Sequence, residues 1–224
     1  AEKPMIIFGG GLLESEDSEL ATNFLTYINK GVPGLSAGNW QGLNILPSGA
    51  NQVGQMDLGV NTTPFIEPGV LFLFGADDYE VEASGKSFVI YLGHHGDVNA
   101  SKADIILPGA AFTEKSAPYV NAEGRPQETR RVFLAPDLAR EDWKIIRALS
   151  EIMGGSFQLS YDNVDKLKER LYQVAPSFMS NDVFVSCSFN AFDSKVESPV
   201  SVSRDPLTKK VADFYKTDSI SRAS

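Results

Sequence analysis

Short runs of consecutive apolar residues alternate along the chain with segments in which apolar residues recur every three or four positions. The runs predict strands at Met5–Phe8, Leu43–Leu46, Val70–Phe74, Phe88–Leu92, Asp104–Leu107 and Arg130–Leu134. Continuous apolar runs of this length are typical of strands that are covered on both faces, as in a parallel sheet. The alternation of such strands with helical segments therefore predicts an α/β fold.

The first predicted helix follows Gly9-Gly10-Gly11, so the chain opens with a strand, a glycine turn and a helix. Ser15 or Ser18 is expected to cap this helix and Gly31 to end it. Its apolar stripe consists of Leu20, Phe24, Tyr27 and Ile28. Such a turn can bind phosphate, but Glu14 occupies the place of the third glycine in the dinucleotide-binding fingerprint. Tight packing between strand and helix is the alternative explanation of these glycines.

Two more amphipathic helices are predicted in the second half of the chain, at Glu141–Met153 and at residues 163–174. Glu141 and Asp142 suit the positive end of the first helix dipole, and Asp162 is expected to cap the second helix. The apolar stripes are Trp143, Ile146, Leu149 and Met153 in the first helix and Val164, Leu167, Leu171 and Val174 in the second. One side of each helix is therefore expected to face the core.

The rest of the chain is organised around Ala103–Gln127, where the strand at Asp104–Leu107 ends sharply at Pro108-Gly109. A long loop follows, and its polar positions are Glu114, Lys115, Asn121, Glu123 and Arg125. Pro118, Gly124 and Pro126 restrict its backbone, so these side chains are expected to be held in fixed places. In an open α/β sheet, ligands bind outside the carboxyl ends of the strands. This loop is therefore the first place to look for a site.

The sequence of this loop resembles the molybdopterin oxidoreductase family. The similarity lies in Leu107–Pro108, Thr113–Lys115 and Tyr119–Gln127. The segment Gly93–Asp97 and the tail Asp213–Ser224 resemble more narrowly one branch of that family, the large iron–sulfur subunits of mitochondrial respiratory complex I. The tail is the most discriminating of these motifs, because the catalytic members of the family lack it.

This resemblance implies a Rossmann-like, three-layer open α/β sheet over residues 1–178, followed by an extended C-terminal tail over residues 179–224. It also implies a structural, non-catalytic part of the large subunit that supports assembly of the peripheral arm during NADH-to-quinone electron transfer. The expected partners are other peripheral-arm subunits and the N-terminal portion of the same subunit, where the iron–sulfur clusters are expected. The expected location is the matrix side of the mitochondrial inner membrane.

Three departures from the family pattern argue against a cofactor in this chain. Ala117-Pro118 replaces the usual Gly-Thr, and Ala122 replaces the usual Thr, so a hydroxyl and a backbone donor are lost. The single cysteine, Cys187, cannot supply the four thiolates of an iron–sulfur cluster. We therefore predict no catalytic, cofactor-binding or metal-binding residue. The alternatives are a fragment of a catalytic molybdopterin oxidoreductase and a free nucleotide-binding module.

Two further motifs have competing interpretations. In cofactor-binding members of the family, the equivalent of Gly75-Ala76-Asp77 faces the nucleotide part of the cofactor, whereas a solvated turn is the simpler interpretation of Asp77-Asp78. The pair His94-His95 could suggest a metal site. Adjacent side chains on an extended backbone point to opposite faces, so a hydrogen-bonded loop is the favoured interpretation of the pair.

Composition narrows the possible partners. The chain has 29 acidic and 20 basic residues and a net charge of -9, which argues against binding to nucleic acid or to an anionic membrane. Its apolar runs are all shorter than the roughly 18 residues that a membrane span needs. The sequon at Asn61 is dismissed because nothing else indicates secretion. From about Ser186 the composition is typical of a linker, and Phe214, Tyr215 and Ile220 are expected to anchor the tail to a neighbouring surface.

Overall fold

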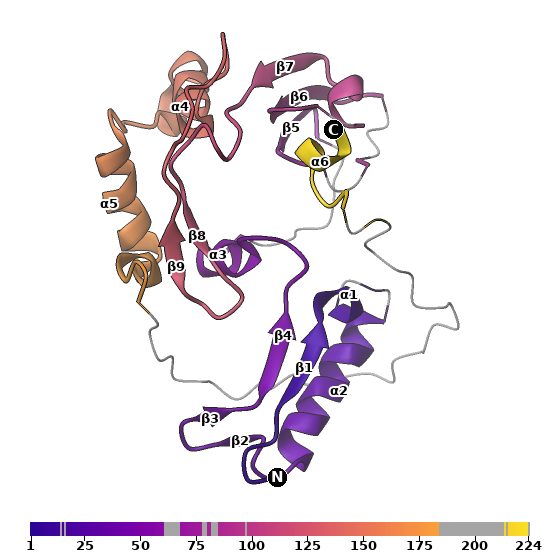
Figure 1. Ribbon diagram of the computed structural model, residues 1–224. Helices are drawn as coiled ribbons and strands as arrows, with labels where there is room; N and C mark the ends of the chain where they lie inside the picture. Colours follow the sequence, from indigo (N-terminus) through magenta and orange to yellow (C-terminus); the bar gives the residue numbers. More distant parts are fainter. Residues whose placement is uncertain are drawn as a thin grey trace.

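The computed structural model describes residues 1–13, 15, 17–60, 68–77, 80–81, 85–96, 98–183, 213 and 215–223. Within these residues, the strands form one three-stranded sheet and three two-stranded sheets. The N-terminal unit lies at one end of the molecule and the three-stranded sheet at the other (Figure 1). The predictions at Asn61, at Cys187 and along the linker fall outside the described residues.

The N-terminal unit is a parallel strand pair covered by a helix. Strand β1 (Ile6–Gly9) pairs with β4 (Leu43–Leu46), and the short helix α1 (Gly10–Leu13) and the longer α2 (Ser18–Gly31) connect them with the hairpin of β2 (Ser36–Ala37) and β3 (Trp40–Gln41). Leu25, Leu35 and Leu43 form its core. A Cβ at Gly10 would lie 3.0 Å from the Leu46 carbonyl oxygen, which supports the packing explanation of the glycine turn.

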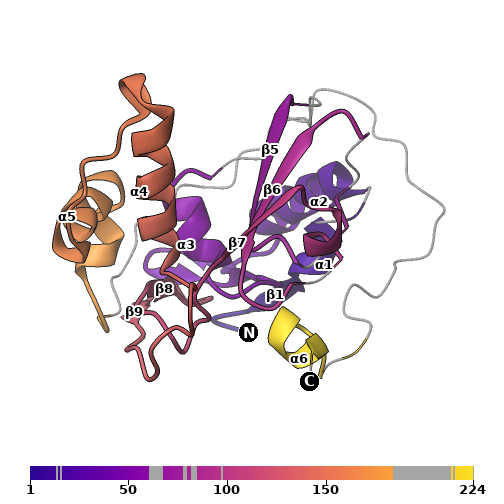
Figure 2. The ribbon, with the colours of Figure 1, turned by 90° about the horizontal axis from the view of Figure 1, so that it is seen from above.

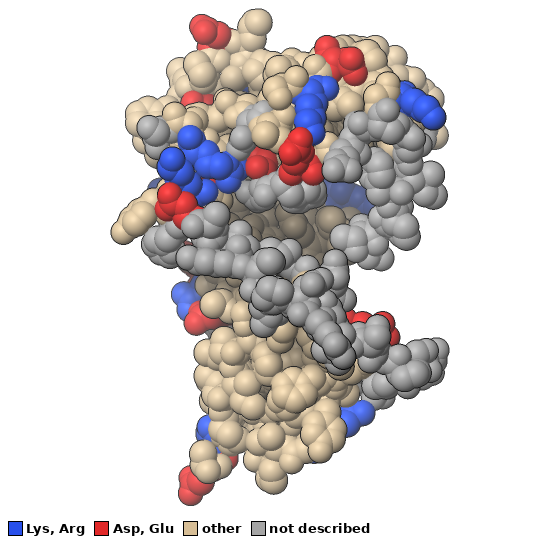
Figure 3. Space-filling view, turned by 90° about the vertical axis from the view of Figure 1, so that its right-hand side faces the viewer, with Lys and Arg blue, Asp and Glu red and all other residues tan. Residues whose placement is uncertain are grey.

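Two details of the predicted first helix are wrong. Its N-cap is Asp17, whose side chain makes no capping hydrogen bond, while the Ser15 hydroxyl donates to the Leu12 carbonyl. The buried positions are Ala21, Leu25 and Thr26, whereas Phe24 and Tyr27 are exposed. The strand pair determines which side of the helix is covered, and the apolar pattern extends beyond that side. The face of this unit that Figure 3 shows, in its lower part, carries few charged side chains.

The three-stranded sheet is parallel throughout, in the order β5-β6-β7, and consists of β5 (Val70–Phe74), β6 (Phe88–Gly93) and β7 (Ile105–Pro108). Its packed side contains Leu73, Val89 and Tyr91, with Ala100 from the 3-10 helix η1 (Ala100–Lys102) against them. The prediction that the third strand is buried on both faces is wrong. β7 is an edge strand in which Ile105 and Ile106 are 43% and 55% exposed.

The remaining elements form a helical layer with a hairpin against it. Helices α4 (Asp142–Met153) and α5 (Val164–Val174) lie side by side (Figure 2), with η2 (Gly155–Phe157) between them in sequence and η3 (Pro176–Met179) after α5. Strands β8 (Pro118–Val120) and β9 (Pro126–Glu128) pair antiparallel, and α3 (Gln52–Asp57) packs beside β8. Val120, Ala175 and Phe178 form the core of this part.

Both helix predictions in this part are confirmed, with local corrections. Asn163, and not Asp162, caps α5, because its side-chain oxygen accepts from the Lys166 amide at 2.9 Å. Two stripe residues, Met153 and Val174, are exposed. The strand predicted at Arg130–Leu134 is wrong, since this segment is irregular and its apolar side chains are exposed.

The described tail ends in the short helix α6 (Ser219–Ala223), where Ser219 is buried and Ile220 half-buried, while Tyr215 is exposed. The α/β class and its parallel strands are confirmed. The division at residue 178 stays a prediction, as does the three-layer open sheet, because the described strands form separate small sheets.

Candidate functional site

The loops that leave β5, β6 and β7 meet at one edge of the sheet. Phe74 pairs with Leu92, and Leu92 pairs with Leu107, so all three strands end at the same level. The Gly109 amide donates to the Gly93 carbonyl at 2.8 Å and continues the ladder beyond the strands. This carboxyl edge is the place where an open α/β sheet binds ligands. The long loop after β7 starts here, as the sequence predicts.

The buried side chains of Tyr91 and Asn99 form hydrogen bonds with the residues that follow β5. The Tyr91 hydroxyl, on a side chain that is 1% exposed, donates to Asp77 Oδ1 at 2.6 Å. The Asn99 side chain is 2% exposed; its Oδ1 accepts from the Val81 amide at 2.9 Å, and its Nδ2 donates to the Ala76 carbonyl. The interpretation of Asp77 as part of a solvated turn is therefore wrong, because its carboxylate binds the sheet core.

The C-terminal helix reaches the same edge. Arg222 Nη2 donates to the Asp77 carbonyl at 2.8 Å, a contact between residues 145 positions apart in sequence. Figures 1 and 2 both show α6 next to the end of the β5-β6-β7 sheet. The side chain and the carbonyl of Asp77 are thus bound by two different parts of the chain, Tyr91 and Arg222.

The two histidines after β6 face each other instead of pointing to opposite sides. Their Nδ1 atoms are 2.7 Å apart, and their rings meet edge to face with centroids separated by 5.0 Å. The backbone here is not extended, because the chain bends after Gly93 and Gly96 has a φ of 62°. No group of three metal-ligating side chains occurs in the part of the chain that the structure describes.

Burial lowers the pKa of His94 below its ordinary value of 6.5, and the charges of His95 and Lys115 lower it further, against the opposing effect of Asp77 and Asp142. Because the pKa is lower in the folded state, the unfolded chain takes up more proton below pH 6.5. The contribution of His94 to the free energy of unfolding should therefore be fully present above pH 6.5, and it should be lost as the pH falls toward the lowered pKa. His94→Gln should remove this part of the pH dependence. Urea denaturation of both proteins between about pH 7.5 and 5.5 tests this, and equal pH slopes would contradict it.

Two charged residues of the loop after β7, Glu114 and Lys115, bind within the chain. Lys115 forms an ion pair with Asp142, at the first turn of α4. Glu114 Oε2 accepts from the Ala111 amide at 2.9 Å and thereby closes a tight turn. The prediction that these side chains are held in fixed places is confirmed for both residues.

The Asn121 side chain stabilises the β8-β9 turn. Its side-chain oxygen accepts from the amides of Glu123 and Arg125 at 3.0 and 2.9 Å, and so fixes the hairpin. At the other end of β8, the Ala117 amide donates to Thr129 Oγ1 at 3.1 Å. No local pattern in the sequence connects Asn51 with this loop, yet Asn51 Oδ1 accepts from the Val120 amide at 2.8 Å.

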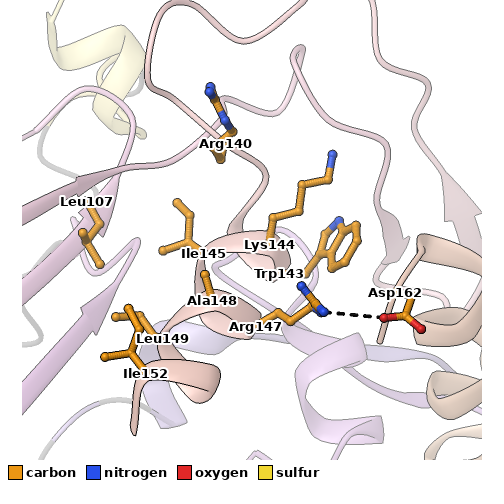
Figure 4. A pocket seen from close by; sticks show the side chains of 10 residues that line it. All are labelled: Leu107, Arg140, Trp143, Lys144, Ile145, Arg147, Ala148, Leu149, Ile152 and Asp162. Carbon is orange, nitrogen blue, oxygen red and sulfur yellow. Dashed lines mark ion pairs between the residues drawn. The ribbon is translucent and has the colours of Figure 1, made fainter. Parts of the chain in front are cut away.

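Two hollows adjoin these elements. One, of about 440 Å³, lies between the loop and helices α4 and α5, and its polar lining includes Lys115, Glu141 and Asp142. The other, of about 630 Å³, lies between Leu107 of β7 and the exposed apolar side of α4 (Figure 4). The ionic groups of the first hollow are paired, Lys115 with Asp142 and Glu141 with Lys144.

No described helix is both long and apolar enough to cross a membrane. Comparison with known proteins gives two family matches. A model described as molybdopterin oxidoreductase matches residues 1–152. A model of the C-terminal region of an NADH-ubiquinone oxidoreductase subunit matches residues 184–224.

Similar proteins match the full length of the chain. They include the mitochondrial NADH-ubiquinone oxidoreductase 78 kDa subunit of Candida albicans, 42% identical over 100% of this chain and 32% of that protein. The 75 kDa subunit of Reclinomonas americana is 38% identical over 100% of this chain and 33% of its own length. The iron-sulfur protein 1 of NADH dehydrogenase from Solanum tuberosum is 37% identical over 100% of this chain and 30% of its own length. The chain thus spans about a third of the length of these relatives. Because the first family model covers more than half of the residues, the chain belongs to the molybdopterin oxidoreductase family.

Proposed function

We propose that this chain is a structural, non-catalytic part of the large iron–sulfur subunit of an NADH-ubiquinone oxidoreductase, respiratory complex I. Two matches support the proposal: the molybdopterin oxidoreductase model, and the NADH-ubiquinone oxidoreductase model that follows it along the chain. Similarity of 37 to 42% to named complex I subunits, over the whole chain, supports it further. On this proposal, the relatives' additional length corresponds to the N-terminal portion that carries the iron–sulfur clusters.

The observation that carries the non-catalytic role is the occupied carboxyl edge. A pterin dinucleotide needs free donors for its phosphates and ring, but here the donors of Tyr91 and Arg222 bind Asp77, and Lys115 binds Asp142. Carboxylates at this edge would repel an anionic cofactor. The residues present therefore do not fit the family's cofactor, and we derive no redox step from it.

The rest of the proposal concerns architecture and location. The family's three-layer sheet would be completed by portions of the subunit beyond this chain. The partners are other subunits of the peripheral arm, and the location is the matrix side of the inner membrane. The mitochondrial names of the relatives from Candida albicans and Neurospora crassa support the mitochondrial part of that location.

Purification of the tagged native protein in mild detergent, with mass spectrometry of what accompanies it, tests this proposal. We expect the flavin-binding and iron–sulfur subunits of the complex, and none of them from untagged cells. Recovery of the protein without any complex I subunit, or with a bound pterin, would contradict the proposal and favour a catalytic molybdopterin oxidoreductase.

The bond between α6 and the sheet edge gives a local prediction. Arg222→Ala removes the donor to the Asp77 carbonyl, so opening of α6 should become easier by about 1 kcal/mol, or about fivefold in amide exchange. Hydrogen exchange with mass spectrometry over residues 213–223 measures this. Lys216→Ala, an exposed position in the same segment, is the control. Equal exchange in the two variants would show that Arg222 does not hold the helix.

A further inference from the structure

The irregular segment of residues 130–138, which we call the apolar loop, exposes four large apolar side chains. Val132, Phe133, Leu134 and Leu138 are 69%, 63%, 76% and 77% exposed. None of the four belongs to a core cluster in the part of the chain that the structure describes. Apolar side chains that are gathered in one exposed segment are typical of a surface that binds another macromolecule.

The backbone of the apolar loop is held in place, although its side chains are exposed. The amides of Val132 and Phe133 donate to the Thr113 carbonyl at 2.8 and 3.2 Å. Just beyond the other end of the loop, the Arg140 amide donates to the Pro108 carbonyl at 3.1 Å. A loop that is anchored at both ends loses less conformational freedom on binding, and this favours association.

The apolar loop is basic, in contrast to the chain as a whole. Residues 130–140 contain three arginines and one aspartate, a net charge of +2, whereas the whole chain has a net charge of -9. Arg130 and Arg131 are exposed and form no ion pair with any residue that the structure describes. The two carboxylates that line the same hollow as these arginines, Glu141 and Asp162, are each paired with a basic side chain of α4.

We propose that the apolar loop docks into an apolar groove with acidic edges on another subunit of the peripheral arm. This inference rests on the proposed function. Arginine and aromatic side chains are enriched in protein interfaces, and Phe133 is the central anchor of this one. Arg130 and Arg131 face the carboxylates of the partner.

Two arguments select this occupant. Connecting loops lie on the surface of the protein to which they belong, so the apolar loop stays accessible in the complete subunit and a separate subunit covers it. The acidic net charge of the chain disfavours approach to an anionic membrane, which leaves a protein partner.

Hydroxyl-radical footprinting of the complete tagged subunit, free and within the purified complex, tests the inference. Phe133 and Leu134 should be labelled in the free subunit, and their labelling should fall about tenfold in the complex, because exposed side chains become part of an interface core. Tyr91, which is 1% exposed, is the control for an intact fold and should be labelled weakly in both states. Protection that is already present in the free subunit would overturn the proposal, and so would equal labelling in both states.

Matched variants of the complete subunit measure the contribution of the loop to assembly. Phe133→Ala and Arg131→Glu should each enter the complex about tenfold less than the wild-type subunit expressed in the same cells. Arg170→Glu makes the same charge change at an exposed position of α5 and should assemble like the wild type. Equal urea midpoints of the free variants would exclude misfolding as the cause. Undiminished assembly of Phe133→Ala would contradict the proposal.

A benzophenone side chain introduced at position 134 identifies the occupant by photocrosslinking within the complex. We expect a crosslink to a different subunit, in a peptide that contains aspartate or glutamate. A crosslink to lipid, to a second copy or to the same subunit would overturn the proposal. If the subunit copurifies with complex I but forms no crosslink to another subunit, only this inference fails. Without copurification, the proposed function fails.

Discussion

Replacement of Asn99 by alanine is expected to lower the free energy of unfolding by about 3 kcal/mol, because it leaves two backbone groups unbonded. The buried Asn99 side chain accepts from the Val81 amide and donates to the Ala76 carbonyl, and so links both segments to η1. These segments flank Asp77, so the loss should also loosen the carboxyl edge of the sheet. Urea denaturation followed by circular dichroism measures the change.

Ser101→Ala is the matched control for this variant. Ser101 lies two residues further along, is exposed, and uses its hydroxyl to donate to the Val98 carbonyl. Its replacement should change the stability by less than about 0.5 kcal/mol. If Asn99→Ala is as stable as Ser101→Ala, the Asn99 hydrogen bonds to Val81 and Ala76 do not stabilise the carboxyl edge of the sheet.

The second large effect is expected at Gly42, before β4. An added Cβ would lie 2.2 Å from the Pro4 carbonyl oxygen and 2.8 Å from that of Leu35. Both are backbone atoms, so relief requires the chain to move, and the Gly42 hydrogen bonds to Ile6 and Leu35 would be distorted. Gly42→Ala should therefore cost about 3 kcal/mol, the upper range for overpacking.

Trp40 offers a local probe of this change, because its Nε1 donates to the same Pro4 carbonyl at 2.9 Å. Its fluorescence should shift in Gly42→Ala as that bond weakens. Gly9→Ala is the control, since Gly9 lies in β1 and an added Cβ there meets nothing within 4 Å. Comparable stability losses in the two variants would refute the close approach at Gly42.

The strands and helices that the sequence predicts correctly are those with a strong local pattern. The continuous apolar runs of β5 and β6 predict strands. The amphipathic stripe of α4 predicts a helix whose bounds are correct to within one residue. Helix α3 is missed because it has only six residues, three of them polar and one of them glycine. Tertiary contact supports this helix, with Gly54 close to the Asn51 side chain and to Val120, and no local pattern encodes such contacts.

The wrong predictions also have physical causes. The segment Arg130–Leu134 has strand-like residues, but its Val132 amide bonds to the Thr113 carbonyl instead of to a neighbouring strand. The exposure of Ile105 and Ile106 depends on the order of strands in the sheet, which a local pattern does not reveal. The histidines are hydrogen-bonded as expected, but their side chains do not point to opposite faces, because a bend after β6 brings both rings together.

The sequence predicts that the loop after β7 leaves the carboxyl edge of the sheet, as the structure shows, but not the bonds at this edge. It favours a solvated turn at Asp77. It cannot show that Tyr91, fourteen residues away, binds the Asp77 carboxylate, or that Arg222 reaches the same residue from the tail. Contacts over such separations depend on the fold as a whole.

The central claim is that the chain's own side chains occupy the carboxyl edge, so the protein contributes structure rather than chemistry. Elemental analysis of the purified complete subunit, combined with fluorescence assay for released pterin, tests this claim most directly. The account predicts iron but neither molybdenum, tungsten nor pterin. One molybdenum or tungsten and one pterin per subunit would contradict it.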